Sequence, residues 1–308
     1  MKFICVQPAI DYYTWQVEVM INNFIKNGVT PSDIEIVCAH YGAVPQKWQM
    51  LVNAYKGVKF FFYRDTRVKP AYISSVRPHI LHKHWLANPS LQLETIFYCD
   101  CDILLSKPFD TEGLLDNQNC YVSDTVSYIG ADYIRSKGEH YLDLMTTIVG
   151  VNKEFVANHN SDSGGAQYLL KRIPTDFWAK VYYDSESLFR IVTEQIKKDK
   201  AVDPKIHDLQ IWCADMWAVL WNLWFFNKTV LVTDKMSFSW ATSAITEWEK
   251  HPIFHNAGVV NGGQKMFYKA EYRAKLPYDI TLDEFSTDRC SYKYAEEIVK
   301  TKEVTCLS

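Results

Sequence analysis

The sequence has no long hydrophobic run. No stretch reaches the roughly 18 consecutive apolar residues that a transmembrane helix requires. The first residues, MKFICVQPAI, carry one lysine and then an apolar run that is too short for a signal peptide. These absences argue against membrane insertion and secretion. The sequence therefore predicts a soluble protein of the cytoplasm, or of the host cytoplasm if the source is viral.

Paired cysteines and an excess of one charge are also lacking. The eight cysteines are scattered and show no zinc-type pairs, so reduced thiols are expected. The net charge of −3 implies no dominant basic field, although a local basic patch is compatible with that total. The chain also lacks internal repeats and Pro/Gly-rich linkers. With 308 residues, of which 48% are hydrophobic, it is long enough for one large α/β domain.

Strand-like and helix-like segments alternate in the first half of the chain. Because the strand candidates are nearly continuous apolar runs, they predict a mostly parallel sheet covered by helices on both faces. In such sheets ligands bind beyond the carboxyl ends of the strands. The predicted strands are 3–7, 34–39, 59–63 and 95–99, and the predicted helices are 13–26 and 73–87, with Pro78 near a start or kink.

The second half is less regular. A long apolar segment, 209–226, is interrupted by Asp215, and a carboxylate in such surroundings needs a partner or a raised pKa. The other predictions are strands at 144–151, 229–233 and 252–255 and helices at 164–172 and 184–197.

An acidic pair follows the fourth predicted strand. Asp100 and Asp102 flank Cys101 directly after TIFYC, and Pro108 closes the segment. A turn at a strand end lets both carboxylates reach one site, and hard oxygen ligands suit Mg²⁺ or Mn²⁺. The alternative is a solvated acidic turn or a helix cap.

The stretch IFYCDCDILLSKPFD, 96–110, resembles the D-x-D segment of GT-A glycosyltransferases. The resemblance implies a Rossmann-like mixed sheet and a nucleoside diphosphate sugar as donor. It assigns Asp102 as the main metal ligand and Asp100 as a ligand of the donor and the metal. It also implies a catalytic domain at 1–270, with a donor half at about 1–110 and an acceptor half at about 111–270. The tail, 271–308, is expected to pack on this domain.

A second stretch, HPIFHNAGVVNGGQKMFYK at 251–269, resembles the C-terminal metal histidine and phosphate-binding loop of the same enzymes. It implies that His255 is the third metal ligand; the alternative is a buried strand histidine. Lys265, or else Lys269, would contact the diphosphate. Three loop glycines would let the loop close over the donor: Gly258, Gly262 and Gly263.

Other donor contacts follow from the resemblance by position. Asp65, after the third strand, would meet the nucleobase, and Tyr12 or Tyr13, after the first strand, would stack on it. Arg77 would support the sugar or the diphosphate. The alternatives are a turn carboxylate for Asp65, a core ring for Tyr13 and an exposed helix charge for Arg77.

Two acidic residues are candidates for the reacting centre. The resemblance places Asp215 near the anomeric carbon or the acceptor hydroxyl, either as general base or as a contact of the sugar, with Asp208 as a rival. Asp162 is the second catalytic candidate and would bind sugar hydroxyls, next to acceptor contacts at Gly164 and Gly165. The alternatives are a structural ion pair for Asp215 and a helix cap for Asp162.

The predicted function is metal-dependent transfer of a sugar, from a UDP-sugar, to a hydroxyl acceptor. The acceptor candidates are a glycan, a protein side chain and a hydroxymethylated DNA base of a phage-type system. For DNA, a basic face would come from Lys197, Lys198, Lys200, Lys205, Lys269, Arg273 and Lys275. A nucleotidyltransferase is an alternative, but its glycine-rich loop is missing from VQPAIDYY. An inactive nucleotide-sugar binding module is another.

Overall fold

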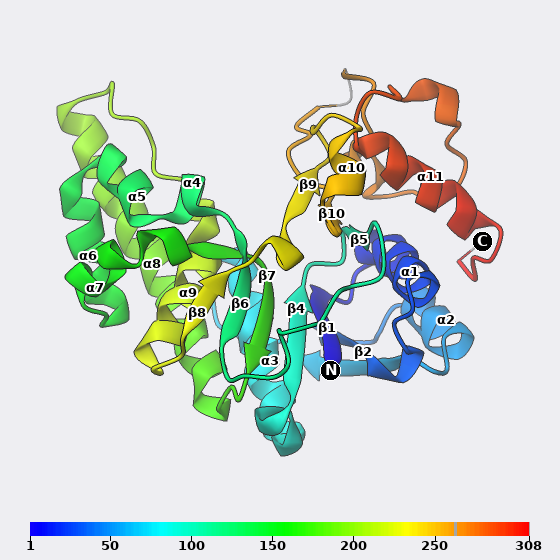
Figure 1. The fold of residues 1–308 in the computed structure, drawn as a ribbon, viewed down its shortest axis with the longest axis horizontal. Helices are drawn as coiled ribbons and strands as arrows, with labels where there is room; N and C mark the ends of the chain where they lie inside the picture. Colours follow the sequence, from blue (N-terminus) through cyan, green and yellow to red (C-terminus); the bar gives the residue numbers. More distant parts are fainter. Residues whose placement is uncertain (262–263, 308) are drawn as a thin grey trace. The chain divides into compact units, whose positions relative to one another are not determined.

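The structure, a computed structural model, describes residues 1–261 and 264–307. Its main sheet has seven strands in the order β3-β2-β1-β4-β7-β6-β8 (Figure 1). Three strand pairs, β1–β2, β2–β3 and β6–β8, are parallel, whereas β6 and β7 are antiparallel. A second sheet has three short strands in the order β5-β10-β9. The predicted fold class, a mixed and mostly parallel sheet flanked by helices, is confirmed.

The chain divides into two compact units, and each is discontinuous in sequence. Unit 1 contains Met1–Arg64, Tyr98–Glu112 and Asp234–Ser308, and unit 2 contains Asp65–Phe97 and Gly113–Thr233. Strand β4 (Thr95–Cys99) begins in unit 2 and ends in unit 1.

The first part of unit 1 is a parallel layer with two helices. Strands β1 and β2 are buried along almost their whole length, whereas β3 is only partly buried, as befits an edge strand. On α1, Val17, Ile21 and Phe24 are fully buried at the spacing of one helix face. The elements are β1 (Lys2–Pro8), α1 (Asp11–Lys26), β2 (Ile34–His40), α2 (Gln46–Ala54) and β3 (Lys59–Arg64).

The rest of unit 1 is built around the small sheet. Strand β10 pairs with β5 in antiparallel and with β9 in parallel orientation. The last helix packs against α1, so the tail belongs to this unit. The elements are β5 (Ile103–Leu105), β9 (Phe238–Trp240), α10 (Glu247–Lys250), β10 (Ile253–His255) and α11 (Ser291–Lys302).

Unit 2 combines one long helix, α8 with 28 residues, several shorter helices and three complete strands. Its core contains Trp85, Trp178 and Trp217, all fully buried, and the indole N–H groups of Trp85 and Trp217 donate to backbone carbonyls at 3.0 and 2.7 Å. The elements are α3 (Val76–Ala87), β6 (Cys120–Asp124), α4 (Val126–Ile129), α5 (Ala131–Lys137), α6 (Glu139–Val149), α7 (Lys153–Asn158), β7 (Gly164–Lys171), α8 (Thr175–Val202), α9 (Ala214–Phe225) and β8 (Val230–Val232).

Two sequence predictions in unit 2 are wrong. The strand expected at 144–151 is the end of α6, whose residues Leu142, Met145 and Val149 bury one helical face before Gly150 ends the helix in the left-handed region. The helix expected at 164–172 is strand β7. The segment GGAQYLLK has too few apolar residues to distinguish the 3.6-residue period of a helix from the two-residue period of a strand.

The two glycines that open β7 allow close approaches, Gly164 to β6 and Gly165 to Met216 of α9. A Cβ atom on Gly164 would lie 2.5 Å from the backbone oxygen of Ser123, and one on Gly165 would lie 2.8 Å from Met216. The strand pairing then shifts register between Val122 and Ser123, opposite Ala166, which has a φ of 65°. Gly164 therefore has a packing role, whatever it contributes to acceptor binding.

We expect Gly164→Ala to lower the free energy of unfolding by about 2 kcal/mol, because the new methyl group overlaps a strand backbone that has no room to shift. Gly42→Ala is the matched control, since nothing lies within 4 Å of its Cβ position and its φ is not positive. Urea unfolding of the three proteins measures the effect. Equal midpoints for both variants would contradict the packing argument.

Candidate metal centre

The acidic pair lies where the sequence predicts it, at the carboxyl end of β4. Four of the five β4 residues are buried, so the strand is fixed, and the chain turns at Cys101 before entering β5. The side chain of Asp100 is 23% exposed and that of Asp102 only 6%. Asp102 is therefore the carboxylate that most needs partners in the protein.

Strand pairing brings His255 to this pair. In the antiparallel ladder of β5 and β10, His255 stands opposite Ile103, and the N–H of Asn256 donates to the Asp102 carbonyl at 2.9 Å. His255 Nε2 lies 3.4 Å from Asp102 Oδ1 and 3.8 Å from Asp100 Oδ2. The imidazole also stacks on Trp240, with ring centroids 5.7 Å apart and planes at 18°. The ring is thus held by its strand and by Trp240.

Lys269 is the cation beside Asp102. Its ammonium donates a short hydrogen bond to Asp102 Oδ2, while Oδ1 faces His255. Burial by itself raises the pKa of Asp102, but the Lys269 ammonium and His255 outweigh it and hold that pKa well below its usual range. Asp102 is therefore ionised at neutral pH.

The three side chains form a donor set that fits a divalent cation. Asp100, Asp102 and His255 each offer one ligand atom, and these atoms lie within 4.8 Å of one another. Two carboxylate oxygens and an imidazole nitrogen suit Mn²⁺ or Mg²⁺, with water and substrate oxygens completing the shell. A bound cation of this kind would neutralise charge on a diphosphate leaving group.

The buried amide of Asn256 adds a polar group that sequence reasoning missed. Its side chain is 3% exposed, and its Nδ2 has no hydrogen-bond partner among the residues that the structure describes. An unsatisfied buried donor is costly, so the group is available to an oxygen-rich ligand. The only sequence signal is its position directly after His255.

The other donor residues expected in unit 1 lie on loops and on the first turn of α1. Tyr13 packs edge-on against Tyr12, with ring centroids 4.9 Å apart. Lys265 adopts a φ of 49° and Gly258 a φ of 91°, both in the left-handed region. Gly262 and Gly263 lie outside the described residues. The donor contacts of Tyr13 and Lys265 remain predictions.

Unit 2 brings together two candidates that are far apart in sequence. Arg77 Nη1 lies 3.3 Å from Asp215 Oδ2, and the Tyr72 hydroxyl lies 2.6 Å from Asp215 Oδ1 and from the Trp212 carbonyl. Burial, and then the Asp215 carboxylate, raise the pKa of Tyr72 well above its ordinary value, so the hydroxyl keeps its proton. Asp215 itself stands in the first turn of α9, where the helix dipole favours a negative charge. Sequence reasoning missed Tyr72.

Asp65 is held by a residue that the sequence places two positions away. Arg67 binds both of its carboxylate oxygens, with Nη2–Oδ2 at 2.9 Å and Nε–Oδ1 at 3.1 Å, and the Asp65 side chain is 1% exposed. His79 lies 3.9 Å from the same carboxylate. Burial, and then the Lys83 ammonium, lower the pKa of His79 to about 4, so its ring is neutral at pH 7. The nucleobase contact of Asp65 remains a prediction.

The remaining candidates belong to the segment before β7. Asp162 ends the short 3-10 helix Asn160–Asp162, and its carboxylate has no hydrogen bond or ion pair with any described residue. Gly164 and Gly165 are buried within β7. The rival acid Asp208 instead forms a surface ion pair with Lys200 at 2.7 Å.

No protein-family model and no curated protein sequence matches this chain. Among solved structures, it is similar to the bifunctional glycosyltransferase WbbM in its apo form, with 10% identity and a TM-score of 0.47 over 98% of this chain and 52% of that one. It is also similar to the galactosyltransferase LgtC with donor and acceptor sugar analogues, with 12% identity and a TM-score of 0.44 over 97% and 95% of the two chains. A third similar structure is the glycosyltransferase GlyE of Streptococcus pneumoniae TIGR4, with 10% identity and a TM-score of 0.45 over 99% and 62%.

The chain thus spans about half the length of WbbM. All three structures are of glycosyltransferases. Within the described part of the chain, none of the helices combines the length and the apolar character that a membrane crossing needs.

We expect Lys269→Met to destabilise the protein by about 2 kcal/mol, because it leaves the buried Asp102 carboxylate without its ammonium partner. The Lys269 side chain is 33% exposed, and solvent screening keeps the effect below that of a fully buried pair. Thermal unfolding without metal measures it. Mn²⁺ should restore more stability to this variant than to the wild type, since a cation replaces the lost charge.

Lys56→Met is the matched control, because Lys56 is exposed in a turn of the same unit. Equal melting temperatures for the two variants, with no larger response of Lys269→Met to Mn²⁺, would show that Lys269 does not balance the charge of Asp102.

Proposed function

We propose that this chain is a metal-dependent glycosyltransferase that moves a sugar from a UDP-sugar to a hydroxyl acceptor. The observation that carries the proposal is the convergence of Asp100, Asp102 and His255 from two separate parts of the sequence. A chance acidic turn has no reason to meet a strand histidine and a half-buried lysine. The acidic pair follows strand β4 of the mostly parallel sheet, at the strand end where such sheets bind ligands, and this position supports the same function.

The donor is proposed to bind through its diphosphate and its base. Asp102, His255 and Asp100 hold the cation, Mn²⁺ or Mg²⁺, and Lys265 contacts the diphosphate. Tyr13 offers its ring to the nucleobase. These assignments rest on the motif positions and on the charge balance at Asp102.

Asp65 and Arg77 complete the proposed donor contacts. For Asp65, the bidentate pair with Arg67 fixes the carboxylate in one orientation, as recognition of a base N–H requires. Arg77 is proposed to support the sugar or the diphosphate, and its ion pair with Asp215 fixes its guanidinium.

Asp215 is proposed as the acid at the reacting centre. Arg77 and Tyr72 both contact its carboxylate, whose side chain is 14% exposed, and these contacts fix its orientation. In an inverting reaction it takes the proton of the acceptor hydroxyl while that oxygen bonds to the anomeric carbon and the bond to the diphosphate oxygen breaks. In a retaining reaction it contacts the sugar and stabilises the oxocarbenium-like state.

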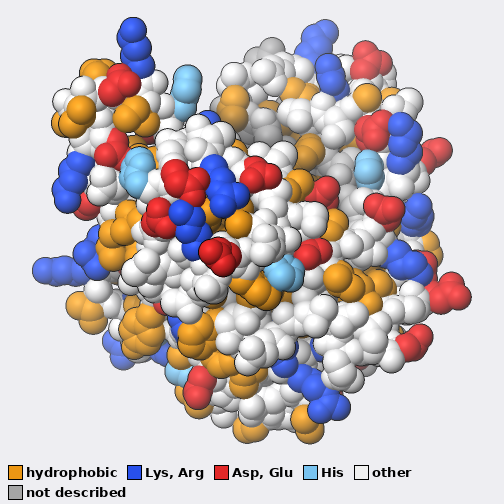
Figure 2. Space-filling model, turned by 60° about the vertical axis from the view of Figure 1, so that its left-hand side comes forward, with side chains coloured by type: hydrophobic (Ala, Val, Ile, Leu, Met, Phe, Trp, Pro, Cys, Tyr) orange, Lys and Arg blue, Asp and Glu red, His pale blue; other side chains and the backbone are white. Residues whose placement is uncertain are grey.

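We propose a glycan rather than modified DNA as the acceptor. Of the lysines expected to form a basic face, Lys197 pairs with Glu194 and Lys200 with Asp208. In the view of Figure 2, Lys and Arg side chains are interspersed with Asp and Glu and form no continuous basic stripe. Such balanced surface pairs supply little of the counterion release that drives DNA binding.

Asp102→Ala is expected to lower sugar transfer by about 10³-fold at saturating Mn²⁺, because the cation loses its most buried ligand. The measurement is UDP release from a panel of UDP-sugars, with oligosaccharides or hydroxymethylated DNA as acceptor and with or without Mn²⁺. Asp110→Ala is the control, since Asp110 is an exposed acid of the same segment, paired with Lys235 at 2.6 Å. Retained turnover in Asp102→Ala would refute the proposal.

Asp215→Asn is expected to lower kcat by about 10² to 10⁴-fold with little change in the binding of UDP, because the amide cannot accept the proton. Asp208→Asn, the rival acid with a surface ion pair, should retain wild-type turnover. Steady-state kinetics of the two variants, with UDP binding measured separately, decides between them. A loss in Asp208→Asn and none in Asp215→Asn would reverse the assignment.

A further inference from the structure

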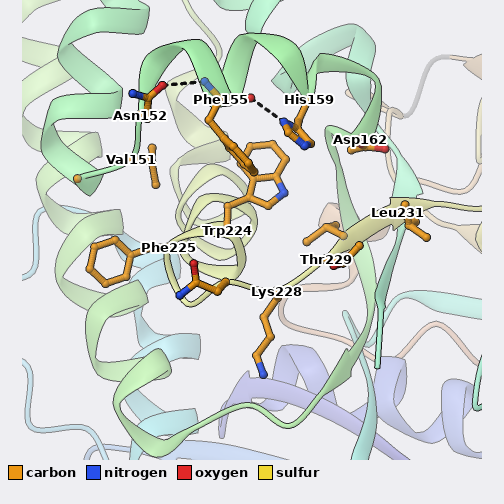
Figure 3. A pocket seen from close by; sticks show the side chains of 13 residues that line it. Val151, Asn152, Phe155, His159, Asp162, Trp224, Phe225, Lys228, Thr229 and Leu231 are labelled. Carbon is orange, nitrogen blue, oxygen red and sulfur yellow. Dashed lines mark hydrogen bonds between the residues drawn. The ribbon is translucent and has the colours of Figure 1, made fainter. Parts of the chain in front are cut away.

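Unit 2 contains a cavity of about 710 Å³ that none of the proposed donor groups lines. It lies between the segment 150–162, which includes α7, and the segment 224–231, which joins α9 to β8 (Figure 3). Its size falls within the range of ordinary small-molecule sites.

One wall of the cavity is aromatic and partly open to solvent. The Phe155 ring stacks on His159, with centroids 3.9 Å apart and planes at 21°, and meets Trp224 edge-on at 5.8 Å. Phe155 is 41% exposed and Phe225 is 45% exposed, although both rings are large and apolar. Figure 3 shows Phe155, His159 and Trp224 grouped at the centre of the site. The stacking partners hold the exposed Phe155 ring in one orientation.

The position of Phe155 is also fixed by its backbone. The side chain of Asn152 caps α7 by accepting from the N–H of Phe155 at 2.8 Å, and His159 Nδ1 lies 2.8 Å from the Phe155 carbonyl. A short helix that would otherwise fray therefore presents a preorganised flat surface.

Polar side chains form the rim of the same cavity. The half-buried carboxylate of Asp162 and the exposed side chains of Asn227 and Thr229 line it, and none of the three makes a hydrogen bond to another described residue. Lys228 lines it too, but its ammonium donates to the Arg172 carbonyl at 2.7 Å. The cavity thus offers one carboxylate, one amide, one hydroxyl and one ammonium, and the ammonium already donates one of its three N–H groups to a carbonyl.

This combination selects one class of ligand. A nucleotide or another phosphate needs cationic donors, and here the one carboxylate would repel it. A lipid chain needs an apolar lining without unpaired polar groups. A sugar ring has an apolar C–H face that packs on an aromatic ring and a rim of hydroxyls that carboxylate and amide groups bind. Only the sugar uses both the aromatic wall and the polar rim.

We propose that this cavity is a second carbohydrate-binding site, which holds about two to three pyranose rings of a neutral glycan. Phe155 provides the flat face, and Asp162 accepts hydrogen bonds from sugar hydroxyls. The site goes beyond the proposed transfer reaction, because glycan binding here requires neither the cation nor the donor. A glycan held in this way stays attached to the protein between encounters with the donor, which raises its effective concentration.

The test is saccharide binding by the full chain without nucleotide. The probes are maltotriose, cellotriose and tri-N-acetylchitotriose, and their binding is measured by saturation-transfer NMR and by calorimetric titration. At least one probe should bind, and Phe155→Ala should raise its Kd by about tenfold. Asp162→Asn should raise the Kd as well, since the amide is a weaker acceptor. Phe155→Leu keeps an apolar side chain against Trp224 and removes only the flat face, so it should weaken binding like Phe155→Ala.

Two controls make the outcome specific. Tyr183→Ala removes another exposed aromatic ring of unit 2, 66% exposed and outside the cavity, and should bind as the wild type does. Asp102→Ala should also bind the saccharide normally, so loss of transfer and loss of this site are distinguishable. If none of the three probes binds, or if the Phe155 variants bind as tightly as Tyr183→Ala, the carbohydrate site is refuted.

Discussion

The ionised carboxylate of Asp102 is the group on which the candidate site depends. A charge that is almost fully buried is tolerated only with close partners, and here Lys269 takes one oxygen while the other faces His255. Both partners come from sequence more than 150 residues downstream, and the ladder between β5 and β10 sets the distance. The small three-stranded sheet therefore brings the acidic turn and His255 together as a candidate cation site.

In unit 2 the corresponding constraint is the pairing of Asp215. Its helix begins inside a strongly apolar segment, so the carboxylate needs the Arg77 guanidinium and the Tyr72 hydroxyl. The same unit keeps Asp162, Asn227 and Thr229 without partners around a set of exposed rings. The acid proposed at the reacting centre is therefore oriented by partners within the protein, whereas the polar rim of the proposed glycan site is open to a ligand.

The pattern of hydrophobic residues predicted the elements with a clear apolar pattern. Strand β4 has the bounds expected from TIFYC, and α1 and β10 begin within two residues of the expected positions. The helix expected at 184–197 is only the middle part of α8. The prediction failed in the segments where residue pattern is ambiguous. The end of α6 is rich in β-branched residues, which are typical of strands. Strand β7 begins with two glycines, which favour neither helix nor strand. Their structures are decided by packing against neighbouring elements.

The sequence by itself determined the acidic pair, the strand that leads into it and His255 as the candidate third ligand, because local hydrophobicity and motif spacing can be read from the chain alone. Only the tertiary structure decided that Lys269 balances Asp102, that Arg77 meets Asp215, and that Arg67 fixes Asp65. The physical reason is that ion pairs depend on distances of a few ångströms between side chains, and strand register and helix packing set those distances. The aromatic cavity follows the same rule, since Phe155 and Trp224 become neighbours only in the folded chain.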